Sequence, residues 1–157
     1  YNAAQFTFNL GQTIILWMTN NSTGTRRNPY NQAYGGGGTI TMEGTNVFNY
    51  YYGQAGTDGN PYTSFTSGMS VAVGETAMIA VTRTTSQLCW YKNGVLDVAG
   101  ANAYGNITTG TNNITIGYGY TGVGFGGNIY AMQVYNRGLS SAEISQNFSA
   151  LRGRFGL

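Results

Sequence analysis

The sequence lacks histidine and contains a single cysteine, Cys89, in 157 residues. Without histidine, neither Ser-His nor Cys-His nucleophilic catalysis is available, and histidine ligation of a metal is excluded. With one cysteine, no disulfide can form within the chain, so an extracellular scaffold held by disulfides is also excluded. We expect Cys89 to behave as a small buried hydrophobic side chain.

Charge is also scarce, because charged residues make up 8% of the chain, against roughly 25% in ordinary domains. The net charge is +2, and the longest basic run is the pair Arg26-Arg27. This pattern argues against a nucleic acid as the main partner. No apolar run approaches the ~20 residues of a membrane-spanning helix, so no membrane span is predicted.

The few acidic residues are widely spaced, and the nearest two, Glu43 and Asp58, are 15 positions apart. Retaining glycoside hydrolysis needs two carboxyl groups about 5 Å apart, which on one strand means acids two or four positions apart. That spacing is absent, so we do not expect an enzyme, unless folding brings distant acids together. Asp58 and Asn60 are candidates for a weak calcium site. We favour a turn in which Asp58 bonds its own backbone, and we predict no metal and no cofactor.

Glycine and aromatic residues fill the composition instead, with 25 Gly and 13 Tyr. Short apolar or tyrosine-rich runs separated by glycine-containing turns are typical of an all-β protein, here a two-sheet antiparallel β-sandwich in one domain, residues 1–157. The Lys92-Asn93-Gly94 turn inside Gln87–Val98 predicts a hairpin with a type I′ turn. The other predicted strands are Thr13–Thr19, Thr39–Glu43, Val47–Tyr52, Met69–Val73, Thr76–Arg83, Asn113–Gly117 and Ile129–Tyr135, with a further strand in which Phe6, Phe8 and Leu10 alternate with polar residues.

Two glycine-rich segments lie between these strands. The four glycines Gly35–Gly38 are not followed by the Lys and Ser/Thr of a phosphate-binding loop. They therefore indicate a flexible turn or a close backbone contact. Gly53–Gly68 reads as a long loop, which is uncommon unless it is functional.

One short helix is predicted near the C-terminus. Ser140 and Glu143 have the spacing of a capping box, and Leu139 and Ile144 that of a hydrophobic staple. Apolar residues then recur at helical spacing, and Gly153 is the expected stop.

The runs IYAMQVYNRGLSSAEI and WYKNGVL resemble the closing strand and helix and the central hairpin of laminin-G-like jelly rolls, in the concanavalin A-like lectin and glucanase superfamily. The ending YNRGLSSAEISQNFSALRGRFGL is similar to the ends of such domains in phage virion structural proteins. The resemblance implies a jelly roll. Where the family often has acidic residues in the closing strand, this chain has Tyr130 and Ala131, so the resemblance does not imply a metal site there.

Lectin sites on this fold combine stacking aromatic rings with short polar side chains on loops. A sugar site and a protein interface, which also favours tyrosine, both remain open. Tyr51 should face away from Tyr50 and Tyr52 if its strand is regular. The candidate ligand-binding residues are Tyr34, Tyr50, Tyr52, Asp58, Asn60, Tyr62, Tyr118 and Tyr120.

These features favour a non-enzymatic virion structural protein at the virion surface, as a decoration, fibre or tail-associated domain that also contacts host glycans. The alternative is a lectin-like carbohydrate-binding module of a bacterial surface or secreted protein. Because Phe155 and Leu157 have no evident place to bury in a lone domain, we expect a homo-oligomer or repeated copy, with the tail and part of Tyr50–Tyr52 touching other virion subunits. The absence of an initiator Met favours a processed product or one domain of a longer polypeptide.

Overall fold

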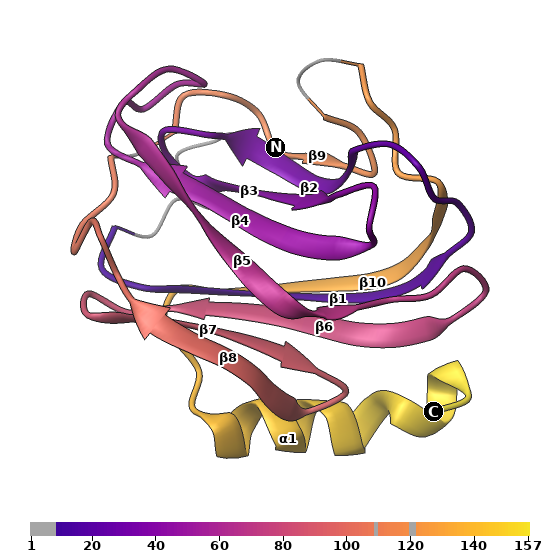
Figure 1. The fold of residues 1–157 in the computed structure, drawn as a ribbon. Helices are drawn as coiled ribbons and strands as arrows, with labels where there is room; N and C mark the ends of the chain where they lie inside the picture. The colour runs from indigo at the N-terminus through magenta and orange to yellow at the C-terminus, as the bar shows by residue number, and fades with distance from the viewer. Residues whose placement is uncertain (1–8, 109, 120–121) are drawn as a thin grey trace.

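The computed structural model describes residues 9–108, 110–119 and 122–157. These residues form two five-stranded antiparallel sheets packed face to face, with one helix outside (Figure 1). Sheet A has the strand order β10-β1-β6-β7-β8, and sheet B has the order β5-β4-β3-β2-β9. The strands are β1 (Gln12–Asn20), β2 (Arg27–Ala33), β3 (Gly38–Met42), β4 (Val47–Gly53), β5 (Tyr62–Ser70), β6 (Thr76–Arg83), β7 (Gln87–Lys92), β8 (Val95–Ala101), β9 (Thr115–Ile116) and β10 (Gly127–Tyr135). The predicted all-β sandwich is confirmed.

Strand β1 is buried on both faces, as its continuous apolar run indicates. Ile14, Leu16 and Met18 point into the core between the two sheets. Ile15 and Trp17 point to the other side, into a second core beneath the helix. We call this second cluster the helix-side core; its buried members are Ile15, Trp17, Met78, Ala80, Cys89, Tyr91, Leu139 and Ile144. Cys89 is thus a buried free thiol, as predicted.

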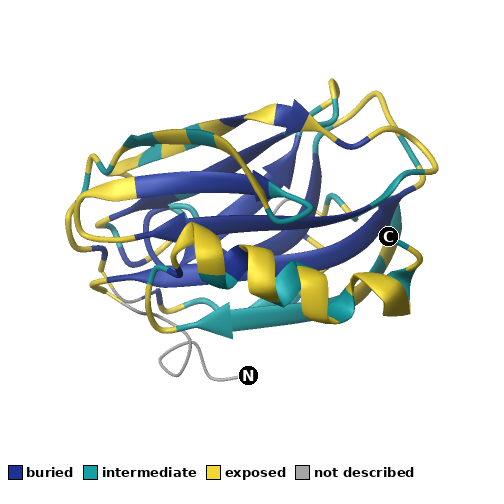
Figure 2. Cartoon of the chain, turned by 90° about the horizontal axis from the view of Figure 1, so that it is seen from below, coloured by how far each residue is buried: buried dark blue, intermediate teal, exposed yellow. Residues whose placement is uncertain are grey.

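The helix α1 (Ser141–Leu151) lies across the outer face of sheet A (Figure 2). Ser140 is its N-cap, and both halves of the capping box with Glu143 are present. The α-helix ends at Leu151 with Arg152 as its C-cap, next to the predicted stop at Gly153. The chain then continues as a 3₁₀-helix, η2 (Arg152–Phe155), which ends at Gly156 with φ +73°. No helix in the described part of the chain is long and apolar enough to span a membrane.

The C-terminal tail folds back on its own domain. Phe155 stacks on Trp17 with ring centroids 4.6 Å apart, and Phe155 and Leu157 both pack against the helix-side core. The expectation that these two side chains lack a place to bury is therefore wrong, because outward-facing β1 residues provide one.

One loop prediction and one strand prediction also need correction. The predicted loop Gly53–Gly68 ends earlier, because β5 begins at Tyr62, and the predicted strand Met69–Val73 contributes only its first two residues to β5. The segment Arg27–Ala33, which was not among the predicted strands, forms β2. The β7–β8 hairpin has its I′-type turn, with φ +50° at Asn93 and +81° at Gly94. Of the predicted first strand, Phe6 and Phe8 lie outside the described residues, and Leu10 is exposed.

Candidate functional site

Three loops meet at one end of sheet B: residues 34–37, residues 54–61, and the described residues 106–108 and 110–113. The Gly35 N–H donates to the Thr57 carbonyl at 2.9 Å, and Thr111 N–H donates to the Gly56 carbonyl at 2.8 Å. Gly36 forms an isolated bridge with Thr108. Backbone hydrogen bonds therefore hold the three loops together.

The glycine run permits this contact. A Cβ added to Gly35 would lie 2.4 Å from the Gly59 carbonyl oxygen, and one added to Gly36 would lie 2.5 Å from the Thr108 carbonyl oxygen. Gly37 and Gly38 have φ of +79° and +87°, in the region that favours glycine. Of the two expectations for the run, the close backbone contact is confirmed.

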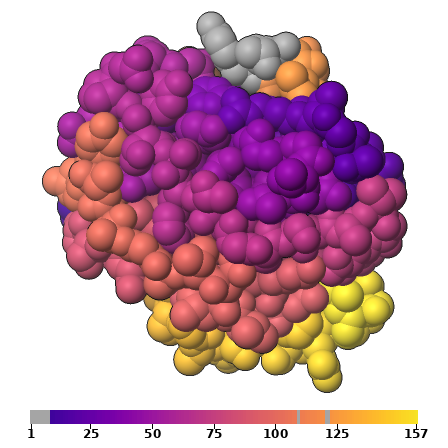
Figure 3. All heavy atoms as spheres, viewed as in Figure 1, coloured from indigo at the N-terminus to yellow at the C-terminus, as the bar shows by residue number. Residues whose placement is uncertain are grey.

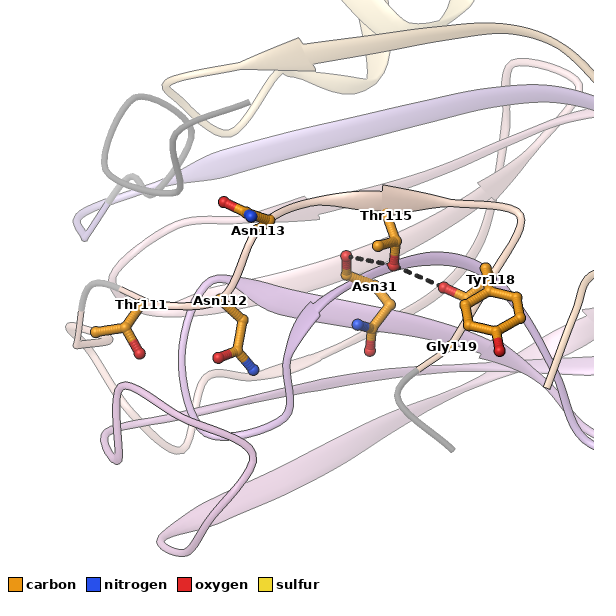
Figure 4. Close-up of a pocket in the computed structure, with 7 residues that line it drawn as sticks. All are labelled: Asn31, Thr111, Asn112, Asn113, Thr115, Tyr118 and Gly119. Carbon is orange, nitrogen blue, oxygen red and sulfur yellow. Dashed lines mark hydrogen bonds between the residues drawn. The ribbon is translucent and has the colours of Figure 1, made fainter. Parts of the chain in front are cut away.

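A pocket of about 480 Å³ opens beside these loops, between β2, β9 and the segments flanking β9 (Figure 4). Asn31 comes from β2 and Thr115 from β9, where the two residues are paired across the strands. The Thr115 hydroxyl donates to the Tyr118 carbonyl at 2.7 Å and lies 3.3 Å from the Asn31 carbonyl. The described residues that line the pocket are Asn31, Thr111, Asn112, Asn113, Thr115, Tyr118 and Gly119.

This pocket is polar and uncharged in its described lining. In Figure 4 the side chains of Thr111, Asn112, Asn31 and Tyr118 point to the same side of the β9 segment, whereas Asn113 points to the other. Tyr118 is 54% exposed. The pocket thus presents amide and hydroxyl donors and acceptors beside one accessible aromatic face.

Asp58 positions one of these amides. Its Oδ2 accepts a hydrogen bond from Asn112 Nδ2 at 2.5 Å, and its Oδ1 accepts from the Tyr34 backbone N–H at 3.3 Å. The favoured expectation, a turn in which Asp58 bonds its own loop backbone, is therefore wrong; Thr57 Oγ1 accepts from Gly59 N–H instead. With its amide nitrogen held by Asp58, Asn112 keeps its carbonyl oxygen as an acceptor for a ligand.

A cluster of three tyrosines lies on the same outer face of sheet B. Tyr34, Tyr51 and Tyr62 have ring centroids 5.0–6.0 Å apart. Register connects the cluster to the pocket: Tyr51 is opposite Thr39, which is opposite Asn31. Paired residues share a face, so Tyr51 and Asn31 lie two strand spacings apart, about 10 Å.

Arg26 and Glu43 stabilise this tyrosine cluster. The Arg26 guanidinium lies over the Tyr51 ring, 5.1 Å from its centroid, donates to the Tyr51 hydroxyl, and pairs with Glu43 Oε1 at 3.1 Å. Burial works to raise the pKa of Glu43, but hydrogen bonds from Thr41, Arg26 and Asn49 outweigh it and hold that pKa below its ordinary value. Burial raises the pKa of Tyr51.

Two predicted ligand residues are buried in the core. Tyr50 and Tyr52 are each 1% exposed and stack on one another with centroids 5.5 Å apart. The Tyr50 hydroxyl donates to Gln12 Oε1 at 3.0 Å. Their placement as surface ligands is therefore wrong. Strand alternation separates Tyr51 from its two neighbours, as expected, but Tyr51 faces outward and Tyr50 and Tyr52 face the core.

Most of the remaining predicted ligand residues belong to the pocket or to the tyrosine cluster. Tyr118 lines the pocket, Asp58 supports it, and Tyr34 and Tyr62 belong to the tyrosine cluster. Asn60 is exposed and precedes Pro61 through a cis peptide bond. Tyr120 lies outside the described residues. Sequence reasoning missed Asn31 and the polar run Thr111–Thr115, although the density of Asn and Thr just before a glycine–aromatic loop was a usable signal.

The five carboxylates are held by different partners. Glu75 pairs with Lys92 at 2.7 Å and Glu143 with Arg137 at 2.6 Å, while Asp97 accepts from the backbone N–H groups of Gly68 and Met69. Among the described residues, no group of three or more Asp, Glu, Cys or His side chains comes together.

The fold and site together define a two-sheet sandwich with a polar, aromatic-rimmed pocket at one sheet edge. The chain belongs to the concanavalin A-like lectin/glucanases superfamily, whose sequence model matches residues 1–145. A search of curated proteins gave no match.

Solved structures share this fold at low sequence identity. The CBM40 module of Ruminococcus gnavus IT-sialidase superposes with a TM-score of 0.73 at 19% identity, covering 93% of this chain and 86% of the module. The same module bound to α2,3-sialyllactose gives 0.71 at 18% identity, covering 89% and 83%. The binding domain of botulinum neurotoxin DC in complex with SialylT gives 0.67 at 14% identity, covering 94% of this chain and 36% of that one.

Proposed function

We propose that this chain is a non-catalytic, lectin-like carbohydrate-binding module, and that its sugar site is the pocket at β9. The observation that carries this proposal is the uncharged pocket in which Asn112, Thr111 and Asn31 face the same side as the half-exposed ring of Tyr118. Aromatic rings stack on the apolar faces of sugars, and amides and hydroxyls bond the sugar hydroxyls. Two structures with this fold support the same function: the CBM40 module bound to α2,3-sialyllactose and the botulinum neurotoxin DC binding domain in complex with SialylT.

The ligand we propose for this pocket is an uncharged sugar. No cationic side chain is among its described lining residues. The carboxylate next to it, Asp58, bonds Asn112 and would repel an acidic ligand. The pocket therefore differs from one built to hold a carboxylate, which calls for arginine.

Titration calorimetry with a panel of uncharged mono- and disaccharides tests this proposal. We expect binding that Asn112→Ala weakens by about tenfold, the value of one or two lost hydrogen bonds. Asn106→Ala is the matched control, because Asn106 is an exposed asparagine in the same loop and outside the pocket lining. Absence of binding at millimolar sugar, or equal affinity in the wild type and Asn112→Ala, would contradict the proposal.

The non-catalytic part of the proposal is supported by the separate engagement of the five carboxylates. The purified domain should release no reducing sugar from polysaccharides. Turnover that disappears in Glu43→Gln or Glu75→Gln would overturn this part.

Two settings are candidates for this module. One is an extracellular or cell surface, and the other is a virion surface, where the chain would be a decoration, fibre or tail-associated subunit. The observation favouring repeated copies is the exposed apolar tip of the β7–β8 hairpin, where Val95 is 69% and Leu96 48% exposed. Neighbouring subunits would cover such side chains. Sedimentation of the native protein beside Leu96→Ser tests it: a self-associating species weakened by the substitution supports the assembly, and a monomer at high concentration contradicts it.

A further inference from the structure

A second depression lies on the opposite side of the molecule from the β9 pocket. It has a volume of about 420 Å³ and is lined by Thr76, Tyr130, Arg154 and Phe155. These residues come from β6, β10 and η2, so the depression opens beside the C-terminal segment against sheet A. That segment, yellow in Figures 1 and 3, lies at the bottom of the molecule, whereas β9 lies at the top of Figure 1.

One wall of this depression is the exposed end of a row of four aromatic rings. The row begins with Phe148 and Trp17, whose centroids are 5.9 Å apart, and continues to Phe155 at 4.6 Å. Tyr130 follows, with its ring 5.9 Å from Phe155 and inclined by 28°. Tyr130 is 50% exposed, and it ends a row whose other members are fixed by the helix-side core. A ligand stacking on it therefore meets a preorganised surface.

Hydroxyl groups hold Tyr130 in place from the other side. Its hydroxyl lies 2.8 Å from Thr19 Oγ1, which in turn lies 2.6 Å from Thr76 Oγ1. Thr76 is one of the lining residues, so this chain of hydroxyls reaches the depression itself. A sugar hydroxyl that enters can join the chain as donor or acceptor.

The depression also holds an available cation. Arg26, Lys92 and Arg137 each pair with a glutamate. Arg154 instead is exposed, lies over the Phe155 ring 5.8 Å from its centroid, and forms no ion pair among the described residues. Its guanidinium is free to bind a carboxylate in a bidentate manner.

We propose that this depression is a second saccharide site, which takes a sugar carrying a carboxylate, such as a uronic or sialic acid. The sugar's apolar face stacks on Tyr130, the exposed end of the row, while Arg154 binds the carboxylate and Thr76 meets a hydroxyl. The two sites then differ in charge preference, with the uncharged sugar at β9 and the acidic sugar beside η2. This second site does not depend on the first.

Calorimetric titration of the full chain at low salt with D-glucuronate, 3′-sialyllactose and lactose tests the proposal. We expect at least one of the acidic sugars to bind, and its affinity to fall by about tenfold or more in Arg154→Gln. Arg152→Gln is the matched control, because it removes the same charge two positions away, from an exposed side chain that does not line the depression. Asn112→Ala should leave the acidic-sugar affinity unchanged, which separates this site from the β9 pocket.

Three results would overturn the proposal. The first is the absence of acidic-sugar binding at millimolar concentration. The second is an equal loss in Arg152→Gln and Arg154→Gln, which would indicate non-specific attraction to a basic segment. The third is loss of acidic-sugar binding in Asn112→Ala, which would place the ligand at β9.

Discussion

At the scale of single residues, the two carboxylates Asp58 and Glu143 illustrate how few charges this fold uses and how specifically each is placed. Asp58 joins the loop of Tyr34 to Asn112 and so positions a pocket amide. Glu143 completes the helix cap and pairs with Arg137. Arg27 is similarly structural: it is buried, and its guanidinium bonds the side-chain oxygens of Asn20 and Asn46.

Asp58→Ala should weaken binding of the uncharged sugar at β9, because Asn112 then loses the partner that holds its amide. We expect a loss of about tenfold, similar to that of Asn112→Ala. Asp97→Ala provides the control, since Asp97 also accepts backbone N–H groups, but at Gly68 and Met69 on β5. Calorimetry should show unchanged affinity in Asp97→Ala; an unchanged affinity in Asp58→Ala would exclude the positioning role.

Glu143 gives a prediction about pH. Hydrogen bonds from Arg137, and then from Ser140, lower the pKa of Glu143 from 4.5 to about 2. A carboxyl whose pKa is lower in the folded chain stabilises the fold above its unfolded pKa and loses this contribution as the pH falls through the folded value. Gln at this position can still complete the cap. The Tm difference between wild type and Glu143→Gln should therefore be largest above about pH 5 and vanish near pH 2. A difference independent of pH would contradict this.

At the scale of elements, the sequence predicted the features that depend on neighbouring residues and missed those that join residues distant in the chain. The capping box, the Asn93-Gly94 turn and the strand at β1 each depend on neighbouring residues, and each is present. Strand β5 was missed because its first half is mostly exposed and follows strong turn formers. The pocket was missed because it joins residues distant in sequence: the hydrogen bond between Thr115 and Asn31 spans 84 positions.

Ser140→Ala should destabilise the domain by about 0.5–2 kcal/mol, because it removes the side-chain acceptor for the Glu143 N–H. Ser145→Ala is the control on the same helix, at an exposed position where alanine is the better helix former. Urea denaturation of both variants checks the prediction. Equal stability in Ser140→Ala and the wild type would show that the cap contributes nothing.

Phe155→Ala should lower the free energy of unfolding by about 1–3 kcal/mol, because the ring stacks on Trp17 and covers the helix-side core. Phe155→Leu, which keeps most of the apolar area, should cost less. Truncation after Gly153 should lower the Tm. The number of protomers in the sedimenting species should stay unchanged. A truncated chain that keeps its Tm but changes its state of assembly would assign the tail to an interface instead.

At the scale of the whole molecule, the outer faces of the two sheets have different roles. Sheet A carries the helix and the C-terminal segment on its outer face, which buries side chains such as Trp17 and Ile144. Sheet B carries no helix on its outer face in the described part of the chain, so no helix covers the pocket beside β9 or the tyrosine cluster. The superfamily and the sandwich followed from the sequence, and so did the opposite facing of Tyr51 and its two neighbours. Which of the two sides is buried depends on how the sheets pack, so the burial of Tyr50 and Tyr52 did not follow.

The most direct test of the central claim, that the β9 pocket binds an uncharged sugar, is an NMR titration of the ¹⁵N-labelled protein with the best-binding uncharged saccharide. The prediction is that the amide shifts that change most belong to Asn31, Thr111–Asn113, Thr115 and Gly119, together with the side-chain amide of Asn112. Shifts confined to other surfaces, or no shifts at saturating sugar, would contradict it.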